Sequence, residues 1–167
     1  GMEALSARRI AKELGVSSMT IYNYVKNLND VKKRVLIAGF DRLYSSVYQS
    51  LSGLEQPVSR RTMCRTMALE VFRFAQANRS IFSFMFFDGR NLIHEDAEVR
   101  PFYAFMTRFV SRPRGYIAGW QPDDMPYNLL ETIITTISYQ CAEGVIKLSE
   151  QAFMDHVNFY IERCIDE

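Results

Sequence analysis

The hydrophobic positions of the chain recur every three to five residues over most of its length, which is the spacing of an amphipathic α-helix. The longest such patterns cover four segments: residues 29–52, 59–77, 127–148 and 151–165. Shorter patterns predict helices at 81–87 and 102–110. Residues 111–126 contain three prolines and two glycines and are expected to be looped or broken in places. Because no segment shows sustained strand alternation, the pattern predicts an all-α fold.

The amino end carries a shorter pattern of its own. Helix formers occupy residues 7–14 and 18–25, and each stretch follows a serine, Ser6 or Ser17, whose hydroxyl can cap the first turn. Gly15 lies between them, where a helix ends in the left-handed conformation that costs glycine little. Two short helices joined by a tight glycine turn form a helix-turn-helix unit.

The second of these short helices has one apolar and one polar face. Projected at about 100° per residue, it turns Ile21 and Val25 inward. Three residues face outward, and their side chains can contact base edges or a thymine methyl group: Met19, Thr20 and Asn23. Three others suit contacts with phosphate oxygens: Tyr22, Tyr24 and Lys26. No acidic residue occurs between Glu13 and Asp30, as expected for a surface that lies against phosphates.

The segment AKELGVSSMTIYNYVKN, residues 11–27, resembles the DNA-binding segment of the TetR (tetracycline-repressor) family. The shared features are the turn at 15–17, the Thr-Ile-Tyr core at 20–22, and Tyr24 with the residues that follow it. The resemblance covers roughly the first 35 residues. It implies base contacts from Ser18, Met19, Thr20 and Asn23, and backbone contacts from Tyr22, Tyr24 and Lys26. Leu28 stands where many members have a lysine, so that one phosphate contact is not implied.

The resemblance also indicates how the chain is divided. We expect a helix-turn-helix DNA-binding domain at residues 1–34 and a larger helical ligand-binding and dimerisation body at 35–167. In the family a helix precedes the turn that residues 1–6 match, and two short helices cannot bury all their apolar side chains between themselves. We therefore expect a first helix to be absent or disordered, unless residues 1–2 are a cloning remnant before a native start.

The helix predicted at 29–52 would connect the amino-terminal domain to the body. Asn29 is its predicted cap and Gly53 its predicted end, while Ser80 is the predicted cap of the helix at 81–87. At ~1.5 Å per residue the connecting helix spans roughly 36 Å. A rod of this length can carry a displacement from the body to the amino-terminal domain.

Charge is divided between the two predicted domains. Residues 1–34 hold seven Lys or Arg against three Asp or Glu, a net of +4, and the remainder holds thirteen against sixteen, a net of −3. A basic amino end on a mildly acidic body suits a DNA-binding domain joined to a body with another task. The apolar fraction of 48% is ample for a core.

No feature of the sequence indicates catalysis. The run His94-Glu95-Asp96 has no second His or Cys at ligand spacing, and His156 stands alone on an amphipathic helix. Glycine loops that bind phosphate and nucleophile elbows are absent. We therefore expect no enzyme activity, no metal and no cofactor.

The cysteines and the lengths of the apolar runs bear on location. Cys64, Cys141 and Cys164 are interpreted as buried thiols in a reducing cytoplasm, with a redox sensor as the alternative. No apolar run approaches the ~20 residues of a membrane span, and no secretory signal opens the chain. We therefore predict a cytoplasmic protein that does not insert into membranes.

The body offers two candidate surfaces. The helices at 127–148 and 151–165 form a pair that would make a four-helix bundle with a second copy; alternatively, both close a monomer core, and the resemblance favours the homodimer. The aromatic side chains between 82 and 109 suit either a filled core or a cavity for a small apolar effector. The candidate pocket residues are Phe72, Phe86, Phe102, Met106, Trp120 and Tyr139.

These observations predict a DNA-binding transcriptional regulator. With the resemblance, they favour a ligand-responsive repressor that binds a palindromic operator on double-stranded DNA as a dimer and is released by a small apolar effector. The alternative is a helical interaction or lipid-carrier protein whose helix-turn-helix unit binds protein rather than DNA.

Overall fold

The computed structural model describes residues 6–55, 57–89, 97–99 and 125–165. Within these ranges every regular element is a helix and no strand occurs, which confirms the predicted all-α fold. The elements, in chain order, are α1 (Ala7–Glu13), α2 (Ser18–Tyr22), α3 (Leu28–Ser52), α4 (Arg60–Ala77), α5 (Arg79–Ser83), the π-helix η2 (Phe84–Asp88), α8 (Met125–Ala142) and α9 (Glu150–Cys164).

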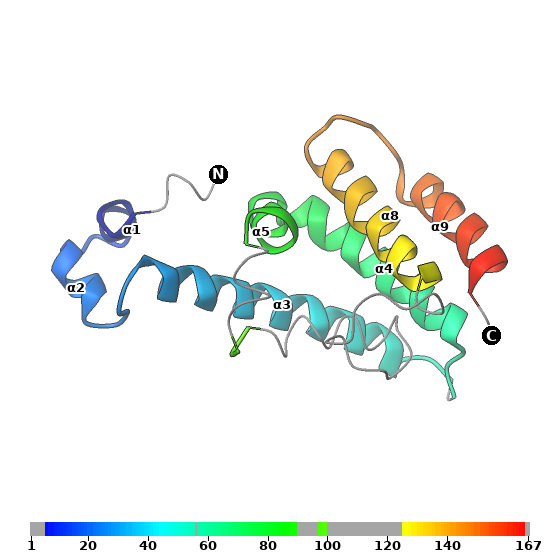
Figure 1. Cartoon of the computed structure of the whole chain (residues 1–167), viewed down its shortest axis with the longest axis horizontal. Helices are drawn as coiled ribbons and strands as arrows, with labels where there is room; N and C mark the ends of the chain where they lie inside the picture. Colours follow the sequence, from blue (N-terminus) through cyan, green and yellow to red (C-terminus); the bar gives the residue numbers. More distant parts are fainter. Residues whose placement is uncertain (1–5, 56, 90–96, 100–124, 166–167) are drawn as a thin grey trace.

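The helix α3 runs from the small amino-terminal pair α1 and α2 into the body, as Figure 1 shows. It crosses the predicted domain boundary at residue 34 without a break. Within the body α4 is central, because it packs against α3, α8 and α9 (Figure 1). The short helix α5 contacts both α3 and α8. The amino-terminal pair is therefore joined to the body through one continuous helix.

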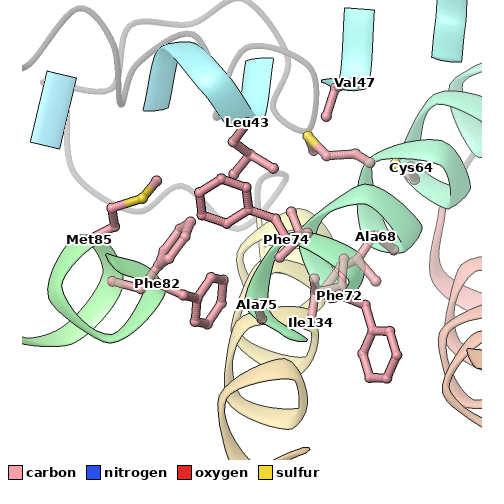
Figure 2. Close-up of a cluster of buried hydrophobic side chains, with 14 of the residues drawn as sticks. Leu43, Val47, Cys64, Ala68, Phe72, Phe74, Ala75, Phe82, Met85 and Ile134 are labelled. Atoms are coloured by element: carbon pink, nitrogen blue, oxygen red, sulfur yellow. The ribbon is translucent and has the colours of Figure 1, made fainter. Parts of the chain in front are cut away.

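The core of the body surrounds α4 (Figure 2). Helix α3 contributes Leu43 and Val47, and α5 and the start of η2 contribute Phe82 and Met85. Buried side chains occur on two sides of α4, as its sequence predicts: Cys64, Met67, Ala68, Val71, Phe72, Phe74 and Ala75. This packing fixes the orientation of α3, since its buried residues recur every three to four positions along one face.

Several predicted helix ends are wrong, and local hydrogen bonds explain the differences. Asn27, not Asn29, caps α3, because its extended backbone lets its side-chain oxygen accept the Asp30 N–H at 3.0 Å. Helix α8 ends at Ala142 instead of 148, because Gly144 takes the left-handed φ of +74° and the next N–H returns to the Gln140 carbonyl at 2.9 Å.

The segment predicted as one short helix at 81–87 is two elements. Helix α5 starts earlier, after Asn78, so that Ser80 lies inside it and caps nothing. It continues into the π-helix η2, which ends at Asp88 with Gly89 as its C-cap. A β-carbon on Gly89 would lie 2.7 Å from the Phe84 carbonyl oxygen and 2.9 Å from Leu36 Cδ2, so only glycine fits where η2 meets α3.

The prediction that all three cysteines are buried is wrong. Cys64 is buried in the core, Cys141 is partly buried and Cys164 is exposed at the end of α9. None of the three forms a disulfide. None of the helices in the described ranges has the combination of length and apolar character that crossing a membrane requires.

Candidate nucleic-acid interface

The turn between α1 and α2 has the geometry that its sequence predicts. Ser6 Oγ accepts the Arg9 N–H at 3.2 Å, and Ser17 Oγ accepts the Thr20 N–H at 3.1 Å, so both serines cap their helices. Gly15 adopts a φ of +67°, which closes α1 and lets the Val16 N–H reach the Ala11 carbonyl at 2.9 Å. The predicted helix-turn-helix geometry is therefore present at the amino end.

The outer face of α2 carries large side chains that no neighbour covers. Met19 is 75% exposed and Tyr22 is 54% exposed, while Ile21 is buried beneath them, at 8%. Ser18 and Thr20 are partly buried. Thr20 Oγ1 lies 2.9 Å from Ser17 Oγ, so its hydroxyl is shared with the cap of its own helix.

Three of the predicted contact residues lie beyond the helix. Helix α2 ends at Tyr22, three residues earlier than predicted. Asn23 is its C-cap and keeps helical backbone angles, so its exposed side chain still continues the outer face. Tyr24, 75% exposed, and the exposed Lys26 lie in the turn that leads to α3. The candidate interface is thus a helix of five residues with the turn that follows it.

The turn after α2 is fastened to the start of α3. The Lys26 N–H donates to Asp30 Oδ2 at 3.1 Å, while the Asp30 N–H donates to Asn27 Oδ1 at 3.0 Å. Arg34 Nε lies 3.5 Å from Asp30 Oδ1. The hydrogen bond from Lys26 lowers the pKa of the Asp30 carboxyl, and the cations Arg34 and Lys33 add to the effect. This reciprocal cap fixes the backbone of Lys26 relative to α3.

Helix α1 carries a basic surface that was not predicted from the sequence. Arg8, Arg9 and Lys12 line an open hollow of about 570 Å³ together with Ser6 and Glu13. The three cations are exposed, and none of them forms an ion pair with another described residue. These three residues are part of the net positive charge of residues 1–34, but a net charge does not show that they share one surface.

Three of the six candidate pocket residues lie outside the described residues: Phe102, Met106 and Trp120. The other three are packed against aromatic side chains. Phe72 stacks on Phe153 with ring centroids 4.3 Å apart. Phe86 is buried with its ring 5.8 Å from that of Phe40. Tyr139 is partly buried, 4.4 Å from the ring of Phe87. Their assignment to an effector pocket stays a prediction.

Side chains that could ligate a metal ion do not cluster in the described ranges. No group of three His, Cys, Asp or Glu side chains lies within reach of one metal ion there. His156 is exposed, with Nδ1 2.6 Å from the Ala152 carbonyl oxygen of its own helix. The run from His94 to Asp96 lies outside the described residues.

Comparisons with known proteins agree with this geometry. A model described as a helix-turn-helix domain matches residues 1–37. A search of curated proteins found no match. The chain is similar to a solved structure from Rhodococcus sp. that is described as a TetR-family transcriptional regulator. The two are 16% identical with a TM-score of 0.67, over 99% of this chain and 90% of the other.

A second solved structure, from Vibrio parahaemolyticus, is described as a transcriptional regulator of the TetR family. It is 19% identical with a TM-score of 0.61, over 100% of this chain and 91% of that one. At these identities the similarity concerns the fold. The chain therefore carries a helix-turn-helix domain at its amino end and has the fold of TetR-family transcriptional regulators.

Proposed function

We propose that the protein is a DNA-binding transcriptional regulator rather than an enzyme. The observation that carries this proposal is the uncovered outer face of α2, where Met19 and Asn23 are exposed beside Tyr22 and no acidic side chain intervenes. Asn can pair with adenine in the major groove, and Met can contact a thymine methyl group. We therefore assign base contacts to Ser18, Met19, Thr20 and Asn23.

Contacts with the DNA backbone would come from both sides of this face. Tyr22, Tyr24 and Lys26 are exposed around the end of α2. In helix-turn-helix proteins the first helix crosses the backbone, and here that helix carries the exposed cations Arg8, Arg9 and Lys12. Each neutralised phosphate releases counterions, so these residues predict a steep dependence of affinity on salt.

A helix as short as α2 contacts few bases, so specific binding requires a second copy. Helices α8 and α9 leave large apolar side chains exposed, with Leu129 and Phe159 at 43% and 63%. Burial of these side chains against a partner would make a four-helix bundle across a two-fold axis. Two recognition helices about 34–36 Å apart then meet successive major grooves of a palindromic operator.

We further propose that a small apolar effector binds the aromatic body and releases the DNA, so that the protein acts as a repressor. The effector shifts the equilibrium only by its differential affinity for the DNA-bound and released conformations. The side chains around Phe72 and Phe86 are aromatic and uncharged, so a ligand that bound among them would be apolar rather than charged.

The deciding experiment measures binding of the full chain to the DNA upstream of its own coding sequence, across a salt series. The regulator is supported if one palindromic site is bound as a dimer and log K falls steeply with log salt, by about 0.9 for each phosphate contact. Absent or salt-insensitive binding would reject it. That outcome would favour the alternative, a helical interaction or lipid-carrier protein whose helix-turn-helix unit binds protein.

A further inference from the structure

Glu70, on the central helix α4, is the one charged side chain in the described ranges that the fold buries almost completely, at 7% exposed. Its neighbours on α4 include the buried residues Val71 and Phe74. A buried carboxylate is costly unless polar groups satisfy it, and its replacement by an apolar side chain is often neutral or stabilising. A group of this kind therefore points to a role in specifying geometry.

Both oxygens of Glu70 are used, and two of their partners come from α3. Ser50 Oγ donates to Oε1 at 3.0 Å, and Ser46 Oγ donates to Oε2. The two serines lie one turn apart and are partly buried on the side of α3 that faces α4. The carboxylate therefore holds two successive turns of α3 at once, which fixes the position of α3 along α4 as well as its rotation.

The same group is connected to the last helix. Arg73 Nη1 lies 3.3 Å from Glu70 Oε1, and the rest of its guanidinium makes two hydrogen bonds to Glu150, at 2.8 and 2.7 Å. Glu150 occupies the first turn of α9. A polar path thus runs from α3 through α4 to α9, the helix that exposes Phe159.

Closer to the amino-terminal domain, α3 packs against α5 and η2 through apolar groups around Gly39 and Met85. Apolar contacts are non-directional and tolerate small changes of angle. The serine–carboxylate bonds do not, because any displacement leaves a buried charge without its partners. The two contacts therefore differ in kind: one is directional and the other adaptable.

We propose that Ser46, Ser50 and Glu70 form a polar clamp that sets the angle of α3 on the body and so determines which half-site spacing the two recognition helices fit. The proposal rests on the function proposed above, in which a dimer binds a palindrome. The three residues act as positioning residues, since none of them lies near the interface with DNA. An altered clamp would change spacing preference without changing contacts within one half-site.

The test compares the S46A/S50A variant with a matched control, S45A/S52A. Ser45 and Ser52 lie on the same helix, are exposed, and donate only to carbonyls of α3 itself, at 2.9 Å. The measurement is the affinity of each folded dimer for a single half-site and for palindromes whose half-site spacing is native or changed by a base pair. S46A/S50A should lose about tenfold or more of its spacing preference while single half-site affinity and the control stay unchanged.

Unchanged spacing preference in folded, dimeric S46A/S50A would overturn the proposal. If that variant does not fold, E70Q serves instead, because it keeps the side-chain size but loses the charge and one acceptor. A second measurement does not use DNA, so a failure of the clamp proposal can be distinguished from a failure of the proposed DNA-binding function. Spin labels at A38C and Q76C, with Cys141 and Cys164 replaced by serine, should report one narrow α3–α4 distance that broadens only when the clamp is altered; no broadening would again reject it.

Discussion

Asn27 and Asp30 form a reciprocal pair of hydrogen bonds at the start of α3. The Asp30 N–H donates to the Asn27 side chain at 3.0 Å, and the Asp30 carboxylate accepts the N–H of Lys26, the residue before Asn27, at 3.1 Å. This pair joins the proposed DNA-contacting turn to the helix that enters the body. We expect Asn27→Ala to lower the free energy of unfolding by about 1 kcal/mol, as measured by urea denaturation. Asn29→Ala is the control, because that exposed neighbour caps nothing, and an equal loss there would contradict the assignment.

The lowered pKa of Asp30 predicts a pH dependence. Its stabilising contribution is present above the pKa of the unfolded chain and is lost as pH falls through the lower folded value. The stability difference between the wild type and Asp30→Asn should therefore be largest near neutral pH and shrink below about pH 4. Denaturation curves across this range provide the measurement. A stability difference that grew on acidification would contradict the predicted direction of the pH dependence.

Substitutions at Asn23 and Lys26 should separate base contacts from phosphate contacts. If Asn23 pairs with an adenine, Asn23→Ala should cost about 1–3 kcal/mol on the preferred operator and much less on an operator altered at that base. Lys26→Ala should weaken binding to all sequences about equally and reduce the salt slope by roughly one. Fluorescence anisotropy titrations measure the affinity for both operators. If Asn23→Ala weakened binding to the two operators equally, Asn23 would not be a base-contacting residue.

The close approach of α3 to η2 predicts that Gly39→Ala is destabilising. A β-carbon at this position would lie 2.6 Å from Met85 Sδ and 3.2 Å from Ile81 Cγ2. Alanine normally gains roughly 1 kcal/mol over glycine inside a helix, but overpacking costs about 1–3 kcal/mol. We expect a net fall in the melting temperature. Gly53→Ala, whose β-carbon meets nothing closer than 3.9 Å, is the control that should be nearly neutral.

The buried hydroxyl of Ser138 predicts a stabilising substitution. This α8 side chain is fully buried, and in the described structure its Oγ has no hydrogen-bond partner. Because an unsatisfied buried group carries its desolvation cost, Ser138→Ala should raise the free energy of unfolding by about 1 kcal/mol. The contrasting variant is Ser149→Ala, which removes the cap bond to Ala152 and should cost about 1 kcal/mol. A loss of stability in Ser138→Ala would reveal a partner for the hydroxyl.

Thiol reactivity should follow burial. Desolvation raises the pKa of Cys64 to about 11, so near pH 8 this thiol stays protonated inside the core. Cys164 is exposed on α9. Brief alkylation of the native protein, followed by peptide mass spectrometry, should label Cys164 and leave Cys64 unmodified until denaturant is added. Early labelling of Cys64 would mean that the contacts around α4 open readily.

The helix-turn-helix geometry was predictable because local residues determine it. Two serine caps and one glycine with positive φ lie within twelve residues, and each acts on its own segment. The long amphipathic helices followed from periodicity for the same reason. Asn27 was missed because Asn29 is an equally good cap by composition, and only the hydrogen bond to Asp30 distinguishes the two.

Features that depend on distant parts of the chain were not predictable from the sequence. Glu70 is one of many acidic residues by composition, and its burial appears only when α3 places two hydroxyls against it. The π-helix likewise depends on packing, because Gly89 must approach Leu36 of α3. Among the aromatic residues at 82–87, Phe82, Phe84 and Phe86 are buried and Phe87 is exposed. Periodicity alone does not distinguish a cavity from a filled core.

Because α3 is uninterrupted, a small tilt of the helix in the body would produce a larger displacement at its amino end. From Ser46 back to Leu28 the helix advances 18 residues, or about 27 Å at ~1.5 Å per residue. A tilt of about 10° at the serine end would swing the far end by about 5 Å, compared with a groove-to-groove repeat of about 34 Å on DNA. Small rearrangements deep in the body would therefore be magnified several-fold at the proposed contact with DNA.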